Sequence, residues 1–278
     1  MLETTLDTLQ IEPKPKRKFA SSPKEVDIES RPVSAERELG GGTEITRLIE
    51  LKDDGRAVFK PADYEDRELN LDSHQRCERA AYLVDRFLDF GLIPSTVIRT
   101  VGNFTGSAQE FIADGKTWDT ATVAERQKTT IDAFKSLWLL DYILYNRDRH
   151  TRNFLVKEDG TLVAIDHGNT LIGGYFSGRF YCPKEENITD DYGVDTMHTN
   201  SGYFDTVLPE VFVNKIKAFA ADKEKQRLLF ELLCEQINTE AATACINRIK
   251  FIAGLIGDDY IISSEHADAL KVSNPLNK

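Results

Sequence analysis

The sequence predicts an α+β fold that is rich in β-structure in its first half and mainly helical toward its C-terminus. Short β-prone runs occupy residues 44–51, 56–60 and 94–99, and turn signals separate them. Residues 208–220, 223–237 and 239–254 instead repeat apolar side chains at the three- and four-residue spacing of a helix. We expect these three segments to form a closing helical layer.

A helix followed by a β-hairpin is predicted between these two parts. Apolar residues recur at helical spacing from Ile131 and predict a helix that ends near Asn146. The runs 154–156 and 162–165 flank Glu158-Asp159-Gly160, and an Asp-Gly pair between apolar runs is a strong hairpin signal. The hairpin would return Asp166, at the end of its second strand, to the loop that contains Asp148 and Asn153.

The spacing of these three polar residues suits phosphoryl transfer. Asn153 follows Asp148 by five positions, and Asp166 follows Asn153 by thirteen. A kinase uses one Asp to orient the attacking hydroxyl, and a later Asn and Asp to hold Mg²⁺. Such residues are also common as turn formers and helix caps. The cations Arg147, Arg149 and His150 around Asp148 favour a site that handles phosphate.

A lysine at the end of an early strand is the second candidate. The runs 44–51 and 56–60 flank Lys52-Asp53-Asp54-Gly55, so they predict a hairpin from which Lys60 projects. A kinase needs a Lys to neutralise the α and β phosphates and an acid to hold that Lys. Taken alone, Lys60 fits a solvated strand end better, and the polar residues at 148, 153 and 166 reverse that preference.

Several ordered motifs resemble a known family. They are VFKP (58–61), CERAAY (77–82), GLIPSTVIR (91–99), GSAQEF (106–111), and DRH with Asn153 followed by AIDHG. Together they resemble the phosphatidylinositol 3-/4-kinase-like group of atypical kinases, in particular its small bacterial members and the related HipA-type protein kinases. The resemblance covers roughly residues 40–170 and implies a two-lobed protein-kinase-like fold, with an ATP cleft between a β-rich N-lobe and a mainly helical C-lobe.

The resemblance assigns expected roles. Asp148 would orient the acceptor, with Arg149 or His150 supporting the loop or the developing charge, while Asn153 and Asp166 would hold Mg²⁺. Lys60 would contact ATP with Glu78 as its partner, and Glu65 is the rival acid. The other expected nucleotide contacts are the lobe-joining Gln109, Glu110, Phe111 and Ile112, the apolar Leu155 and Ile165, and Gly41, Gly42 and Thr43 before the first strand. The glycine segment is equally compatible with a flexible junction. Without the resemblance, Leu155 and Ile165 would be taken as residues of the hydrophobic core.

These assignments divide the chain into four segments. Residues 1–33 are rich in Pro, Lys, Glu and Ser, and we expect a disordered N-terminal tail because few large apolar residues are available to bury. Residues 34–112 would form the N-lobe and 113–264 the C-lobe. Residues 265–278 would form a flexible C-terminal tail.

Composition restricts the function classes. The net charge of −11 disfavours adhesion to nucleic acid or anionic lipid. The longest apolar runs are too short to span a bilayer, so no integral membrane association is expected. Four cysteines without close pairing fit neither a disulfide framework nor a metal site, which favours a cytoplasmic protein.

The acceptor is the remaining question. A phosphoinositide headgroup calls for Lys and Arg near the acceptor position. Residues 167–208 instead contain two cations, Arg179 and Lys184, among six acids. An ATP- and Mg²⁺-dependent kinase acting on a protein Ser/Thr hydroxyl is therefore favoured over a phosphoinositide kinase. A nucleotide-binding pseudokinase is the alternative from another class, although Lys60, Asp148, Asn153 and Asp166 are all present.

Overall fold

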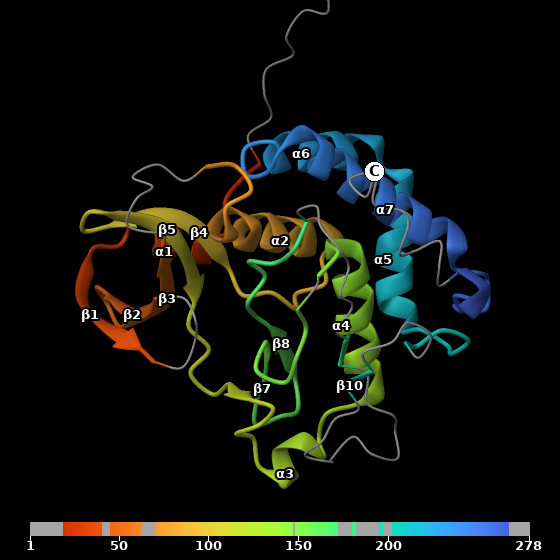
Figure 1. Ribbon diagram of the computed structural model, residues 1–278, viewed down its shortest axis with the longest axis horizontal. Helices are drawn as coiled ribbons and strands as arrows, with labels where there is room; N and C mark the ends of the chain where they lie inside the picture. Colours follow the sequence, from red (N-terminus) through yellow and green to blue (C-terminus); the bar gives the residue numbers. More distant parts are fainter. Residues whose placement is uncertain are drawn as a thin grey trace, which may run out of the picture.

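A five-stranded antiparallel sheet forms the N-terminal part of the molecule (Figure 1). The computed structural model describes residues 19–40, 45–62, 70–146, 148–171, 180–181, 195–196 and 202–266. The strand order in the sheet is β1-β2-β3-β5-β4. Its strands are β1 (Val33–Leu39), β2 (Thr46–Leu51), β3 (Gly55–Pro61), β4 (Thr96–Val101) and β5 (Phe104–Glu110).

The predicted β2–β3 hairpin is confirmed, with Leu51 opposite Gly55 across the turn. The sequence analysis missed strand β1, which pairs with β2 and begins the sheet. Most of β1 is exposed, so its sequence VSAEREL lacks the alternating apolar pattern of a half-buried strand. The glycines after residue 39 therefore connect β1 to β2, and the expectation that they precede the first strand is wrong.

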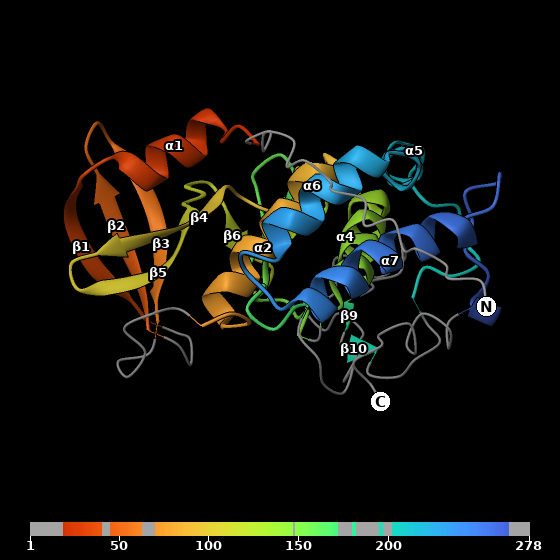
Figure 2. The same ribbon diagram turned by 90° about the horizontal axis from the view of Figure 1, so that it is seen from above.

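Helix α1 (Pro23–Ser30) corrects a second expectation. The helix lies within the segment 1–33 that we expected to be disordered, and it packs on one face of the sheet (Figure 2). Ser22 and Glu25 form a reciprocal capping box at its N-terminus, and Pro occupies the first turn, where its missing N–H costs nothing. Ile28 is its apolar anchor and is 1% exposed. Residues 1–18 lie outside the described residues.

Helix α2 (His74–Leu88) carries Glu78 four residues after its start. Its buried residues include Ala80, Ala81, Val84 and Leu88. Ser73 caps its N-terminus by accepting the Arg76 N–H.

The middle of the chain also follows the prediction. Helix α4 (Ile131–Leu144) is followed by the hairpin of β7 (Phe154–Val156) and β8 (Leu162–Ala164), in which Phe154 lies opposite Ala164. Strand β6 (Lys116–Thr117) extends this hairpin into a three-stranded sheet. A short helix, α3 (Val123–Arg126), precedes α4.

Three helices close the C-terminal lobe, as the periodicity predicted. They are α5 (Glu210–Ala221), α6 (Lys223–Leu233) and α7 (Thr239–Leu255), and a 3₁₀ turn follows at Ser264–His266. Of residues 167–208, the structure describes 167–171, the backbone of β9 (Phe180–Tyr181) and β10 (Asp195–Thr196), and the residues from 202 onward. The expected flexible tail is 265–278: Glu265 and His266 belong to this 3₁₀ turn, and residues 267–278 lie outside the described residues.

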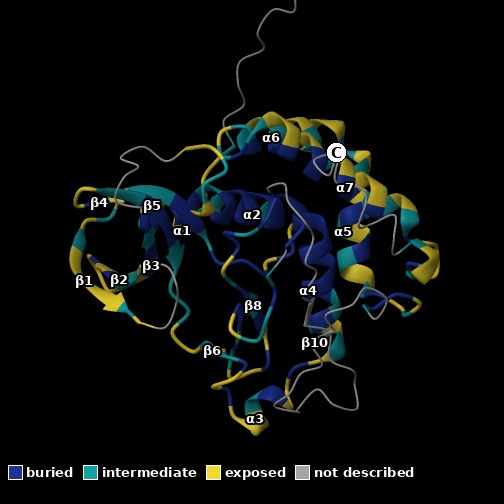
Figure 3. Cartoon of the chain, in the orientation of Figure 1, coloured by how far each residue is buried: buried dark blue, intermediate teal, exposed yellow. Residues whose placement is uncertain are grey.

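The buried apolar residues form two separate cores. One lies between the sheet and α1 and includes Ile28, Ile49 and Phe59. The other is larger and joins α2 to the hairpin and to helices α4–α7. Helix α2 therefore packs with the C-lobe core although its sequence lies between two N-lobe strands. In Figure 3 most of α2 has the colour of buried residues.

Candidate active site

Lys60 lies near the end of β3, where β5 pairs closely with it. Ser107 is opposite Lys60, and Gly106 is opposite Pro61. A Cβ atom on Gly106 would collide with the Lys60 carbonyl oxygen. The Gly in the GSAQEF motif is therefore required for β5 to approach β3 at this point.

The Lys60 ammonium joins three distant parts of the chain. Its Nζ atom lies 2.5 Å from Glu78 Oε1 on α2 and 2.7 Å from Asp166 Oδ1 after β8. The Lys60 and Glu78 side chains are only 17% and 4% exposed, whereas the Asp166 side chain is 48% exposed. Glu78 therefore fills the position of the partner acid. The rival, Glu65, lies outside the described residues.

The charges of this cluster stabilise one another. Burial lowers the pKa of Lys60, but the Glu78 and Asp166 carboxylates outweigh burial and hold that pKa above its usual range. Burial raises the pKa of Asp166, but the Lys60 charge and hydrogen bond outweigh it and lower that pKa below its usual value. At neutral pH the site thus offers a permanent cation beside a permanent, half-exposed anion.

Asp148 and Asn153 occupy the loop between α4 and β7. The Asn153 amide nitrogen donates a hydrogen bond to the Asp148 carbonyl oxygen at 2.7 Å, which closes the loop on itself. The Asp148 N–H donates to Asn146 Oδ1 at 3.0 Å. The Asn153 carbonyl accepts the Ile165 N–H at 3.1 Å, so Asn153 lies beside the residue that precedes Asp166. The hairpin thus brings all three polar residues to one region.

Arg149 is a buried support of this loop. Its guanidinium binds both carboxylate oxygens of Asp141, at 2.9 Å each, and donates to the carbonyl oxygens of Asn153 and Ile165. The side chain is 1% exposed, as is that of Asp141. Arg149 was expected either to support the loop or to stabilise developing charge. This geometry fits support of the loop, because the N–H groups of the guanidinium are all directed at protein acceptors. Arg147 lies outside the described residues.

Two histidines flank the site. His150 is half-buried, and its Nδ1 accepts the Arg152 N–H at 3.2 Å, so its ring packs on the loop. His167, directly after Asp166, is fully buried, and its Nε2 lies 3.0 Å from Arg149. Burial lowers the pKa of His167 well below its usual value, with Arg149 and Lys60 adding to the effect. The His167 imidazole is therefore neutral and accepts from Arg149.

Of the expected lobe-joining residues, Gln109 and Glu110 are the last two of β5, and Phe111 and Ile112 follow the strand. The Gln109 side chain donates to Thr96 Oγ1 at 2.9 Å, and the Glu110 side chain pairs with Lys24 at 3.0 Å. The Phe111 N–H donates to the Arg56 carbonyl, and the Arg56 guanidinium stacks 4.7 Å from the Phe111 ring centre. These side chains are committed within the protein. A nucleotide would therefore meet this segment through backbone groups around Ile112.

Leu155 and Ile165 lie on the hairpin face opposite to the core. Phe154 and Ala164 are fully buried, whereas Leu155 and Ile165 are only partly buried. A Cβ atom on Gly115 would lie 2.8 Å from Leu155 Cδ1 and 3.0 Å from Ile112 Cγ2, so the chain after β5 passes close to Leu155. Leu155 and Ile165 are therefore outside the fully buried core, and they form an apolar surface beside the lobe-joining segment.

Gly41, Gly42 and Thr43 lie outside the described residues. The pairing of Leu39 with Thr46 nevertheless places their segment at the turn between β1 and β2. Their contact with phosphate stays a prediction.

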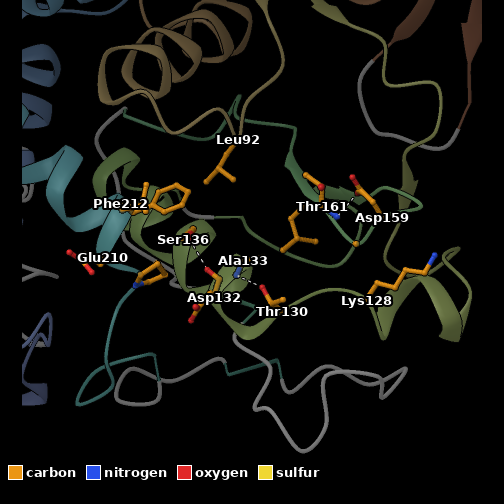
Figure 4. Close-up of a pocket in the computed structure, with 14 residues that line it drawn as sticks. Leu92, Lys128, Thr130, Asp132, Ala133, Ser136, Asp159, Thr161, Glu210 and Phe212 are labelled. Carbon is orange, nitrogen blue, oxygen red and sulfur yellow. Dashed lines mark hydrogen bonds between the residues drawn. The ribbon is translucent and has the colours of Figure 1, made fainter.

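A cavity of about 520 Å³ lies elsewhere in the C-lobe (Figure 4). The first turns of α4 and α5 and the β7–β8 turn form its walls, with Ala133, Phe212 and Thr161 among the lining residues. None of the candidate site residues lines it. It is therefore separate from the Lys60 cluster.

Sequence reasoning missed the supports of the site. Asp141 and Asn146 sit at the end of α4, and the Asn146 amide donates to Asp141 Oδ1 at 2.8 Å. Gln75 on α2 donates to the Pro61 carbonyl at 2.9 Å, one residue from Lys60. Asp141 could have been suspected, because it interrupts an apolar helix. Gln75 gives no signal in the sequence.

The chain has a kinase-like α+β fold, with an N-terminal antiparallel sheet and a helical C-terminal part. Residues 72–190 match the family model described as phosphatidylinositol 3- and 4-kinase. That match covers α2, the loop with Asp148 and Asn153, and Asp166. The expected HipA-type relationship stays a prediction. A comparison with curated protein sequences finds no match.

Solved structures resemble this fold at low sequence identity. The Golgi casein kinase with manganese and ADP bound is 16% identical with a TM-score of 0.52, covering 90% of this chain and 77% of that one. A Fam20 structure from hydra with sugar is 14% identical with a TM-score of 0.54, covering 84% of this chain and 89% of that one. The Helicobacter pylori proinflammatory kinase CtkA is 10% identical with a TM-score of 0.45, covering 88% and 98%. The similarity to the Golgi casein kinase and Fam20 structures confirms the predicted fold class.

No helix in the described part of the chain has the length and apolar character required to cross a bilayer.

Proposed function

We propose that this chain is an ATP- and Mg²⁺-dependent phosphotransferase that transfers the γ-phosphoryl group to a hydroxyl acceptor. The main support is the Lys60 ammonium, held between Glu78 and Asp166 at 2.5 and 2.7 Å. Positioning and charge neutralisation dominate phosphoryl transfer. A fixed cation beside a half-exposed acid, at the junction of sheet and helical lobe, suits that chemistry.

The donor atoms fit a hard divalent cation. Within the described ranges, no group of three His, Cys, Asp or Glu side chains gathers that could hold a metal alone. Asn153 and Asp166 offer an amide oxygen and a carboxylate, and Mg²⁺ is commonly bound by one or two such side chains together with phosphate and water oxygens. The Asn153 nitrogen is already committed to the Asp148 carbonyl, so its oxygen is the available donor. When bound, Mg²⁺ would neutralise charge on the phosphates.

The remaining roles follow from position. Lys60 binds phosphate oxygens, and Glu78 holds Lys60 in place when Asp166 turns toward the metal. Asp148 orients the acceptor hydroxyl and accepts its proton. Ile112, Leu155 and Ile165 provide the backbone and apolar surface for adenine, and Arg149 keeps the loop in shape from beneath. The manganese and ADP in the Golgi casein kinase structure belong to the same ligand class.

A protein Ser/Thr hydroxyl is the favoured acceptor. Residues 167–208 combine six acids with two cations, which suits a phosphoinositide poorly. The phosphoinositide kinase is the second candidate, because residues 72–190 match the phosphatidylinositol 3- and 4-kinase model. A pseudokinase is disfavoured because Lys60, Asp148, Asn153 and Asp166 are all retained.

The test is transfer from γ-labelled ATP with Mg²⁺, offered in parallel to a panel of Ser/Thr proteins and to phosphoinositide vesicles. We expect Mg²⁺-dependent labelling of protein and none of lipid. Labelled lipid alone would favour the phosphoinositide kinase. Nucleotide binding without any transfer or ATP hydrolysis would favour the pseudokinase.

A further inference from the structure

The segment from Phe19 to Ile28 bridges the two cores of the molecule. Ile28 belongs to the core between α1 and the sheet. Phe19 packs instead against the larger core, where its ring stacks on Phe87 of α2 at 4.4 Å between centroids. Ten residues thus connect the sheet, which carries Lys60, to the helix that carries Glu78.

Glu25 is the polar centre of this bridge. Its side chain is 1% exposed and accepts hydrogen bonds from Arg79, at 2.7 Å, and from Arg86, both on α2. The two arginines are seven residues apart, so they lie on one face of the helix, two turns from each other. Burial raises the pKa of Glu25, but the Ser22 N–H and Arg79 outweigh it, and the carboxylate stays charged.

Each arginine makes a second contact that fixes its direction. Arg79 also donates to the Thr96 carbonyl on β4. Arg86 donates to the Ala20 carbonyl at 2.6 Å, and its guanidinium lies 4.2 Å from the Phe19 ring centre. The helix face next to Glu78 is therefore held to the N-terminal segment and to the sheet at once.

The position of α2 decides whether Glu78 reaches Lys60. Arg79 follows Glu78 directly, so a carboxylate that anchors Arg79 restricts both sliding and rotation of α2. The two cores share no apolar residues across this junction. Polar ties such as Glu25 with its arginines therefore add to the direct packing of α2 on β4 and β5.

We propose that Glu25 is a positioning residue for phosphoryl transfer, and that it holds α2 where Glu78 pairs with Lys60. This inference rests on the proposed function. If Glu25 has this role, the segment from Phe19 to Ile28 contributes to the site, although its composition predicted a disordered tail.

The test compares two isosteric changes on one helix. Glu25→Gln removes the buried charge, and Glu29→Gln removes an exposed acid four residues later. We expect Glu25→Gln to lower kcat/KM for ATP roughly tenfold at a temperature where the variant is fully folded, and Glu29→Gln to leave it unchanged. Equal activity of both variants and the wild type would overturn the inference.

A double mutant separates positioning from mere stability. If Glu25 acts through Glu78, then Glu25→Gln adds nothing to the loss caused by Glu78→Ala, because the paired acid is already absent. Independent losses that multiply would overturn the inference. Glu25→Asp keeps the charge and provides a milder variant if Glu25→Gln folds poorly.

A second readout does not depend on turnover. In the wild type Lys60 is charged and paired, so it should react slowly with an acylating reagent. We expect Glu25→Gln to raise the Lys60 labelling rate several-fold, with Lys135 as an internal control for global unfolding. An unchanged Lys60 rate would contradict the inference even if the wild type showed no phosphotransfer. Absent transfer with altered labelling would refute the proposed function alone.

Discussion

The Lys60 ammonium on β3 and the Glu78 carboxylate on α2 lie 2.5 Å apart, and they join the sheet to a helix that packs with the other lobe. Asp166 shares the same ammonium at 2.7 Å. Only Oδ1 of Asp166 holds Lys60, so its second oxygen is available to a metal without release of Lys60. The Lys60–Glu78 pair is the buried part of the site, and Asp166 is the half-exposed part.

Removal of the Lys60 charge should abolish turnover. Lys60→Met keeps the length of the side chain but leaves Glu78 and Asp166 without their cation. We expect kcat/KM for ATP to fall at least about a hundredfold in a coupled ATP turnover assay. Lys52→Met, in the exposed turn before β3, is the matched control and should match the wild type. Activity of Lys60→Met within a few-fold of that control would exclude a phosphate-binding role.

Asp166 should determine the Mg²⁺ dependence of nucleotide binding. Asp166→Asn removes the anionic donor without changing its size. We expect the gain in ATP affinity on adding Mg²⁺ to shrink roughly tenfold, because a hard cation prefers the carboxylate. Calorimetric titrations with and without Mg²⁺ measure this gain, and the exposed Asp119→Asn serves as control. A full Mg²⁺ effect in Asp166→Asn would refute this ligand.

Substitution of Arg149 should lower the free energy of unfolding, because this side chain supports the loop and does not contact the reacting groups. Arg149→Met leaves the Asp141 carboxylate buried without its partner, and breaking a buried pair in this way costs about 3–5 kcal/mol. Urea unfolding should show this loss, while Arg152→Met, at an exposed position of the same loop, should change stability little. A fully stable but inactive Arg149→Met would instead indicate direct contact with the reacting groups.

Asp85 should make stability depend on pH. Burial raises the pKa of Asp85 to about 7, although the backbone N–H groups of Leu92, Ile93 and Gly91 oppose the shift. The unfolded chain releases this proton near its usual value of 3.8. Stability from this group is therefore complete below about pH 4 and is lost as the pH rises toward 7.

The substitution Asp85→Asn isolates that contribution. The Asn oxygen can still accept the Leu92 N–H, but it does not titrate. The unfolding free energy of the variant relative to the wild type should rise by on the order of 4 kcal/mol between pH 4 and 7. Urea unfolding across this range measures the difference, with the exposed Asp119→Asn as control. A constant difference would mean that Asp85 is not protonated in the folded protein.

The parts of the fold that were predictable are those with local signals. The β2–β3 and β7–β8 hairpins follow from Asp-Gly turns between apolar runs, and α4 to α7 follow from their apolar periodicity. Strand β1 and helix α1 escaped prediction because both are largely exposed. Only Ile28 and the buried Glu25 anchor α1, and neither stands out in a sequence rich in charge.

The sequence predicted the main polar residues of the site but not the buried residues that hold them in place. The spacing of Asp148, Asn153 and Asp166 pointed to one region, and the family resemblance paired Lys60 with Glu78. The cations around Asp148 suggested phosphate contact, yet Arg149 turns inward to Asp141. Direction and burial depend on tertiary packing, which residue type and spacing do not encode.

We propose that Asp148 performs a step of phosphoryl transfer that is separate from nucleotide binding. Transfer from γ-labelled ATP by Asp148→Ala, with the Kd for Mg²⁺·ATP measured on the same sample, tests this role. We expect transfer to fall at least about a hundredfold while the Kd stays within about threefold of the wild type. Wild-type transfer rates in Asp148→Ala would rule the role out.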